Sequence, residues 1–206
     1  MAAPSPSRQP APPARAAAGP RRLLVISGPS GAGKSTIAER LLADPRFGRA
    51  ITATTRKPRP GEVDGVHYRF LTESAFREGL AGGAFLEHAE VYGRLYGTPR
   101  ESPEAVLASG RHCVLVLDVQ GAASVRALVP EAHLVFVQAP SLEELRKRLA
   151  TRGLDGADAI ERRLAVVGQE LAQAKSFHLV VVNDDLERAA RHIAASVGVN
   201  DLAPGP

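Results

Sequence analysis

A short apolar run followed by a glycine-rich turn, close to the N-terminus, constrains the fold of this chain most tightly. Residues 23–26 read Leu-Leu-Val-Ile, the pattern of a strand buried on both faces of a parallel sheet. Residues 28–35 then read Gly-Pro-Ser-Gly-Ala-Gly-Lys-Ser, and a helix is expected from about Lys34 to Ala43. Two glycines separated by four residues and followed by Lys and Ser, between a strand and a helix, are typical of a phosphate-binding loop.

The residue types of this loop suit the phosphates of a nucleoside triphosphate. Glycines let the backbone wrap closely around phosphate, so that amides and the helix N-terminus face the anion. Lys34 supplies a mobile cation with a catalytic role, and Ser35 Oγ can ligate Mg²⁺. A glycine-rich turn without a ligand would need neither side chain. We therefore expect ATP, with Mg²⁺ on Ser35, to be bound by Gly28, Pro29, Ser30, Gly31, Ala32, Gly33, Lys34, Ser35 and Thr36.

Strands and helices alternate again in the second half of the chain. Apolar runs predict strands over residues 114–117, 134–137 and 179–182. Helical patterns cover residues 122–128 and 186–197, and a longer one runs from Ser141, with Glu144 placed for a capping box, to about Lys175 with a break at 153–156. This alternation predicts an α/β fold, a doubly wound parallel sheet of P-loop NTPase type that binds ligands at the carboxyl ends of its strands.

The pattern changes between residues 50 and 99. Short alternating runs at 66–70 and 85–91 lie among glycines, which predicts a small antiparallel lobe inserted into the α/β body. We expect a disordered Ala/Pro-rich tail over residues 1–20, one domain over 21–198 and a C-terminal tail over 199–206. Within that domain, the lobe covers about 50–99 and a helical lid about 140–165.

The composition excludes several classes of function. The chain has 206 residues and a net charge of +4, and four arginines within the first twenty-two residues account for that excess. The remainder is charge-balanced, which disfavours nucleic-acid binding. No apolar stretch approaches the roughly 20 residues that cross a bilayer. We expect a cytoplasmic protein, monomer or homodimer, with a buried reduced Cys113; organelle import is the alternative for the tail.

An acceptor site must separate a kinase from a GTPase or a motor ATPase, because the loop and an acid at a strand end, Asp118, are common to all three. Arg56 and Arg59 lie three residues apart in a segment bounded by Pro and Gly, which suits two guanidinium groups on one phosphate. Tyr68 and Tyr96 can add hydroxyl donors.

With these residues the chain resembles the guanylate kinases over about residues 21–197. The resemblance rests on the loop at Gly28, on Thr-Thr-Arg-x-Pro-Arg-x-Gly-Glu at 54–62, and on Tyr-Gly-Thr at 96–98, Asp-x-Gln-Gly at 118–121 and Val-Asn-Asp-Asp at 182–185. It implies phosphorylation of GMP, and of dGMP, by ATP. The GMP phosphate would be held by Arg56, Arg59, Tyr68 and Tyr96, and the guanine would be recognised by Thr52, Glu87, Thr98 and Asp118.

The chemistry of guanine agrees with that assignment. Its N1–H and 2-amino groups are donors that suit the carboxylates of Glu87 and Asp118, and its O6 suits the Thr98 hydroxyl. The resemblance also implies that Arg148, Arg152 and Arg163 are catalytic arginines of the lid and that Asn183 lies near the ATP adenine. Arg148 and Arg152 are four residues apart and share a helix face.

Val116 is a departure from the family pattern, because many members have a second acid two residues before Asp118. The metal contact is therefore expected to be weaker, and Val116→Asp should change the Mg²⁺ dependence of the rate. Two rival functions remain at this stage. A silent module that binds phosphopeptides would usually have a degraded phosphate loop, and a sugar-phosphate kinase of the same fold should lack the two guanine-reading acids.

Overall fold

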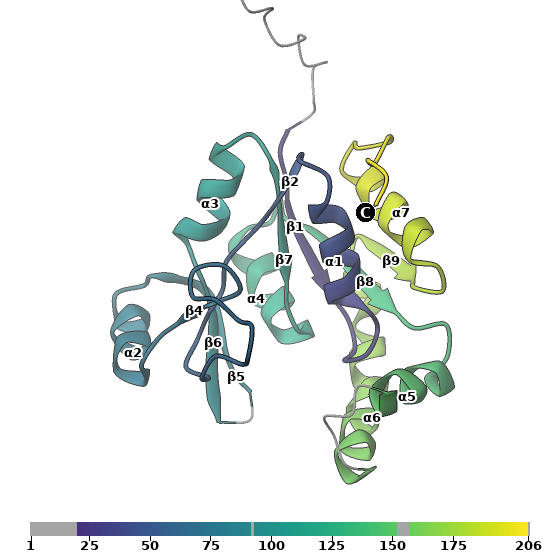
Figure 1. Cartoon of the computed structure of the whole chain (residues 1–206), viewed down its shortest axis with the longest axis horizontal. Helices are drawn as coiled ribbons and strands as arrows, with labels where there is room; N and C mark the ends of the chain where they lie inside the picture. Colours follow the sequence, from purple (N-terminus) through teal and green to yellow (C-terminus); the bar gives the residue numbers. More distant parts are fainter. Residues whose placement is uncertain (1–19, 92, 152–156, 206) are drawn as a thin grey trace, which may run out of the picture.

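The computed structural model describes residues 20–91, 93–151 and 157–205 (Figure 1). Its centre is a five-stranded sheet with the order β2-β7-β1-β8-β9, in which every pair of neighbours is parallel. The strands are β1 (Leu23–Ser27), β2 (Phe47–Arg49), β7 (His112–Val116), β8 (His133–Gln138) and β9 (Leu179–Val182). The predicted α/β class and parallel sheet are confirmed.

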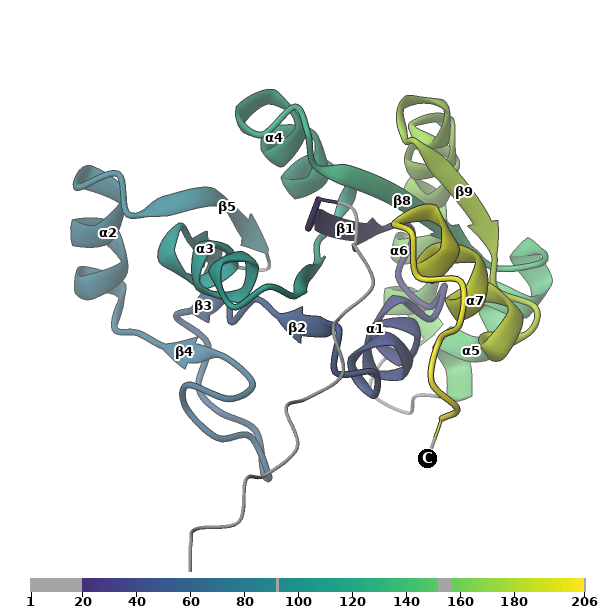
Figure 2. The same ribbon diagram turned by 90° about the horizontal axis from the view of Figure 1, so that it is seen from above.

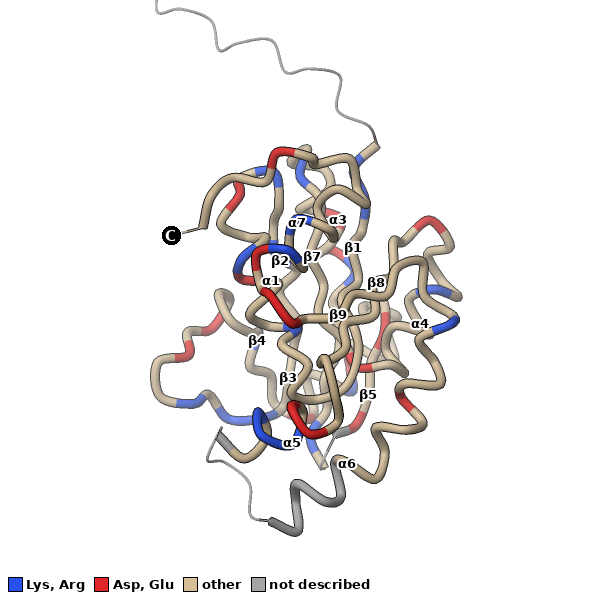
Figure 3. Tube along the Cα trace, turned by 90° about the vertical axis from the view of Figure 1, so that its right-hand side faces the viewer, with Lys and Arg blue, Asp and Glu red and all other residues tan. Residues whose placement is uncertain are grey.

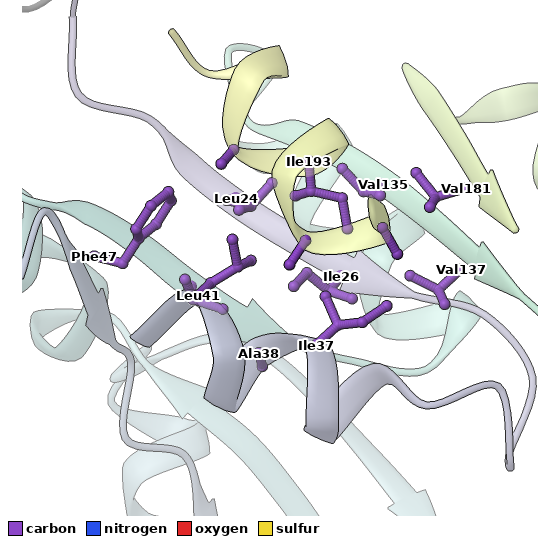
Figure 4. Close-up of a cluster of buried hydrophobic side chains, with 14 of the residues drawn as sticks. Leu24, Ile26, Ile37, Ala38, Leu41, Phe47, Val135, Val137, Val181 and Ile193 are labelled. Atoms are coloured by element: carbon purple, nitrogen blue, oxygen red, sulfur yellow. The ribbon is translucent and has the colours of Figure 1, made fainter. Parts of the chain in front are cut away.

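Helices cover both faces of this sheet (Figure 2). Leu24 and Ile26 point to the face covered by α1 (Lys34–Leu42) and α7 (Leu186–Ser196), where they pack in the main core with Ile37 and Ile193 (Figure 4). Leu23 and Val25 point to the other face, against α3 (Glu101–Ala108) and α4 (Val119–Leu128). Because β1 is buried on both faces, its apolar run is continuous rather than alternating.

A second sheet forms the inserted lobe. Its strands lie in the order β4-β3-β6-β5. The helix α2 (Glu73–Ala81) packs on it, and the ring of Phe76 in α2 stacks on that of Phe85 in the sheet, with centroids 4.4 Å apart. The strands are β3 (Ala53–Thr54), β4 (Arg69–Phe70), β5 (Phe85–Val91) and β6 (Arg94–Pro99). The pairs β3–β6 and β5–β6 are antiparallel as predicted, and β3–β4 is parallel.

Two helices, α5 (Leu142–Thr151) and α6 (Ala157–Ala172), form the region expected as a lid, followed by a single 3₁₀ turn η1 (Ala174–Ser176). They pack together through Leu145, Leu149 and Val167. The Ser141 hydroxyl accepts a hydrogen bond from the Glu144 amide, which is one half of the expected capping box. The Glu144 carboxylate binds Arg148 instead of closing the other half. The expected break at 153–156 lies outside the described residues.

Several elements were not predicted. The strand β2 and the helices α2 and α3 have no counterpart in the sequence expectations, and the run at 66–70 contributes only the two residues of β4. Residues 199–205 lie against the body, because the Asp44 carboxylate accepts from the Ala203 amide at 2.9 Å and Arg40 donates to the Ala203 carbonyl at 2.6 Å. Arg46 also donates to Asp201 at 2.6 Å.

Candidate active site

The loop between β1 and α1 takes its shape from three glycines with positive φ angles. Gly28, Gly31 and Gly33 have φ angles of 131°, 87° and 93°, in the range that L side chains rarely adopt. A Cβ on Gly28 would lie 2.0 Å from the Val137 carbonyl oxygen, and one on Gly33 would lie 2.1 Å from Asn183 Nδ2. The loop is therefore fixed by backbone geometry against the ends of β8 and β9.

Lys34 folds back over this loop. Its Nζ donates to the carbonyl oxygens of Gly28 at 2.6 Å and Pro29 at 2.9 Å. These contacts hold the ammonium group above the turn, at the N-terminus of α1 and beside the loop amides. A cation placed there faces whatever anion the amides bind.

Asn183 joins the loop to the helical region. The residue is 8% exposed, and its side chain donates from Nδ2 to the Ala32 carbonyl at 2.8 Å. The backbone carbonyl of Asn183 accepts from Arg148 Nη2 at 3.1 Å. Arg148 also donates from Nε to Glu144 at 2.9 Å. An open cavity on this side is lined by Gly31, Gly33, Thr36, Glu144, Lys147, Arg148, Asn183, Asp184 and Leu186. The expected phosphate loop, Asn183 and one lid arginine thus share one cavity.

The structure does not place the side chains of the other two expected lid arginines. Arg152 is not among the described residues, and of Arg163 only the backbone position in α6 is described. Basic stretches of the lobe and of α5 lie at the same, lower end of the molecule in Figure 3, the end toward which the strands of the central sheet run in Figure 1. Ligands of open α/β sheets bind at the carboxyl ends of the strands.

A second cavity, of about 250 Å³, lies between the lobe and the end of β7. It collects five of the eight residues expected to bind the acceptor, although they come from separate segments of the chain. Its lining consists of Thr52, Tyr68, Glu87, Ala89, Tyr96, Gly97, Val116, Leu117 and Asp118. The rings of Tyr68 and Tyr96 meet edge to face there, with centroids 6.4 Å apart.

Glu87 is the buried acid of this cavity, with 7% of the residue exposed. Burial raises the pKa of its carboxyl group, the nearby Asp118 charge raises it further, and the hydrogen bond from Thr98 opposes both. Thr98 Oγ1 donates to Glu87 Oε1 at 2.5 Å and is itself fully buried. The single hydroxyl proton of Thr98 is therefore directed to Glu87, whereas the sequence expectation directed it to guanine O6.

Asp118 closes the other side of the cavity at the N-terminus of α4. One of its oxygens, Oδ1, accepts from the Gly121 amide at 2.7 Å and caps the helix. A Cβ on Gly121 would lie 3.1 Å from Glu87 Oε2 and 3.3 Å from Asp118 Oδ1. The absence of a side chain at Gly121 thus lets the two acids approach each other, and together they offer several acceptor oxygens to one ligand.

The basic loop of the lobe is held by an acid for which the sequence predicted no role. Glu62 accepts from both Nη atoms of Arg56 at 2.8 Å and from the Arg59 amide at 2.6 Å. The Arg56 guanidinium also lies over the ring of Tyr68, 5.3 Å from its centroid. Hydrogen bonding to Arg56 lowers the pKa of Glu62 to about 2. Arg59 lies exposed on the loop and does not line the acceptor cavity.

Ser35 lines a small cavity between α1 and the lobe, and Val116 lines the same cavity. In the described ranges, no group of three or more His, Cys, Asp or Glu side chains could hold a metal ion. A hydroxyl at the start of α1 nevertheless fits Mg²⁺ carried by ATP, which keeps phosphate oxygens and waters as most of its ligands. No helix in the described part of the chain is long and apolar enough to cross a membrane.

Comparison with known proteins agrees with these features. A family model for guanylate kinase matches residues 20–198. The chain is 50% identical over 142 residues to a guanylate kinase of Rubrobacter xylanophilus, covering 68% of this chain and 74% of that protein. It is 49% identical over 140 residues to one of Clostridium perfringens, covering 67% and 64%.

Among solved structures, the crystal structure of guanylate kinase from Anaplasma phagocytophilum matches with a TM-score of 0.71 and 30% sequence identity. That match covers 89% of this chain and 87% of the other. The similarity thus extends through the sheet, the inserted lobe and the helices that carry the candidate site. The chain belongs to the guanylate kinase family.

Proposed function

We propose that this protein transfers the γ-phosphoryl group of ATP to GMP, and to dGMP, giving ADP and GDP or dGDP. The observation that carries the proposal is the acceptor cavity, which brings Glu87 and Asp118 together with two tyrosines. The two acids match the N–H donors of guanine, and adenine would leave them without partners.

The two cavities bind and orient the two substrates. The loop amides and Lys34 hold the ATP phosphates, and Asn183 lies where it can meet the adenine. Arg56, Arg59, Tyr68 and Tyr96 hold the acceptor phosphate, while Thr52, Glu87 and Asp118 bind its base and Thr98 fixes the Glu87 carboxylate. When bound through Ser35, Mg²⁺ supplies charge neutralisation on the ATP phosphates.

Transfer needs no covalent intermediate on the protein. A GMP phosphate oxygen attacks the γ-phosphorus in line, the bond to the β-phosphate oxygen breaks, and ADP leaves. Lys34 and the arginines Arg148, Arg152 and Arg163 surround the charge that spreads over the transferred group. Closure of the helical region over the loop excludes water from this step.

The test is a coupled assay of ADP release from ATP and Mg²⁺, with GMP, dGMP, AMP, CMP, UMP, a sugar phosphate or no acceptor. We expect release that depends on GMP and dGMP and is far weaker with AMP. ADP release that depends on the sugar phosphate would instead favour the alternative of a sugar-phosphate kinase. If no acceptor stimulates ADP release by correctly folded protein, the alternative of a silent module that binds phosphopeptides replaces the proposal.

A further inference from the structure

The small cavity between α1 and the lobe contains a charged residue that the proposed reaction does not use. It carries Ser35 from the donor side and Thr52 and Tyr68 from the acceptor side, so it lies between the two substrates. Among the described residues that line it, Arg49 alone carries a formal charge. The remaining lining residues are Ala38, Leu42, Ala50, Val114 and Val116.

The strand register places the Arg49 side chain on this side of the sheet. Arg49 is the last residue of β2, and Phe47, two residues earlier, packs in the core beneath α1. Alternate residues of a strand share a face, so Arg49 also projects toward α1, beside its cross-strand partner Val114. Arg49 ends its edge strand level with Val114 of β7 and Leu24 of β1, and it lines a cavity that extends to Ser35 at the start of α1, the end of the sheet at which phosphates bind in open α/β folds.

No acid competes for Arg49 in this place. In the part of the chain that the structure describes, its guanidinium has no hydrogen bond or ion pair, unlike Arg46, which binds Asp44 and Asp201. Val116 lines the same cavity, two residues beyond Val114 on the same face of the sheet, and a carboxylate there would add a negative charge to the cavity that Arg49 lines. An apolar residue at this position leaves the charge of Arg49 available to an anionic ligand.

We propose that Arg49 is a further phosphate-binding residue of the transfer site, which contacts oxygens of the phosphoryl group as it moves between ATP and GMP. This inference rests on the proposed function. A cavity wall that carries a positive charge and no acid suits a reaction in which a negatively charged phosphoryl group passes from ATP to GMP. The arginine thus gives a positive charge to a cavity in which a second acid at position 116 would have added a negative one.

The experiment compares Arg49→Gln, Arg49→Lys and the matched control Arg77→Gln, which removes an exposed arginine of α2 outside the cavity, in the full chain. We expect kcat/KM for GMP to fall about tenfold in Arg49→Gln, the loss of one charge-assisted contact. Arg49→Lys should keep part of the activity and Arg77→Gln nearly all of it. Melting temperatures of all three variants should match the parent, because Arg49 is exposed at the end of its strand.

Two results would overturn the inference. One is unchanged kcat/KM in Arg49→Gln, and the other is an equal loss in Arg49→Lys, which would show that shape rather than charge matters. Both are read against a parent protein that phosphorylates GMP. A parent without GMP-dependent activity would instead refute the proposed function, so the two failures are distinguishable.

Discussion

The donor and acceptor halves of the site are built in opposite ways. The donor loop is one contiguous segment whose shape depends on backbone: glycines at positive φ, and a lysine bound to carbonyl oxygens of its own loop. The acceptor cavity is made of side chains from distant segments, and these bind one another, as Thr98 binds Glu87 and Glu62 binds Arg56. A single change should therefore cost more on the donor side than on the acceptor side.

Lys34→Ala gives the largest expected effect. Loss of a charge aimed at the transferred group removes stabilisation that the loop amides cannot replace, so kcat should fall by about 10²- to 10³-fold or more. Steady-state assays with saturating ATP and GMP measure this. Lys57→Ala, in the exposed loop of the lobe, is the matched control and should keep its activity. Near-full activity of Lys34→Ala would contradict the proposed role.

Glu87→Gln tests the acceptor half at its buried acid. An amide replaces one carboxylate oxygen with a donor that faces the guanine N–H groups, so kcat/KM for GMP should fall about 100-fold. The rate with AMP should change little, and selectivity therefore decreases. Glu90→Gln, on the same strand but exposed and outside the acceptor cavity, serves as control. Equal losses with both nucleotides would argue against base recognition.

The two halves also differ in how far the sequence predicts them. The phosphate loop was predicted residue by residue, because its signal lies in eight consecutive positions between a strand and a helix. The acceptor residues came from a family resemblance, and their mutual contacts could not follow from it. The Thr98 hydroxyl points to Glu87 because strands β5 and β6 place Glu87 and Thr98 opposite each other.

Short elements escaped prediction for a related reason. The strand β2 has three residues and ends at the exposed Arg49, so it lacks the long apolar run of a central strand. The lobe strands β3 and β4 have two residues each, and tertiary pairing rather than local pattern defines them. Glu62 appeared only as the last position of a motif, since its pairing with Arg56 depends on how the loop folds back.

Thr98→Val separates the hydrogen bond from the carboxylate and has a smaller effect. Burial already raises the pKa of Glu87, and the Thr98 hydroxyl lowers it by stabilising the ionised form. Removing that donor should raise the pKa further. Because guanine binding needs the ionised acid, the acid limb of the kcat/KM profile for GMP should move to higher pH. If the acid limb does not shift, it reports the titration of a group other than Glu87. The control is the profile of Glu87→Gln, which should lack this limb.

Glu62→Gln should have the smallest effect and decides what the acid on Arg56 does. The Glu62 carboxylate competes with the acceptor phosphate for the Arg56 guanidinium. It also orients that guanidinium, because it accepts from both Nη atoms and from the Arg59 amide. The pair is partly buried, with 16% and 17% of the two side chains exposed, and a phosphate dianion that displaces the carboxylate keeps the guanidinium paired with an anion, so orientation should dominate.

The KM for GMP in Glu62→Gln should therefore rise no more than about fivefold with kcat unchanged. Glu73→Gln, which removes an exposed acid paired with Arg77 on α2, is the control and should leave KM alone. The lowered pKa of Glu62 keeps it ionised at neutral pH, so its pairing is lost only as pH falls toward about 2. A KM that falls instead would mean that Glu62 mainly competes with the GMP phosphate for Arg56. The contacts within the acceptor half would then weaken substrate binding rather than orient the residues that bind it.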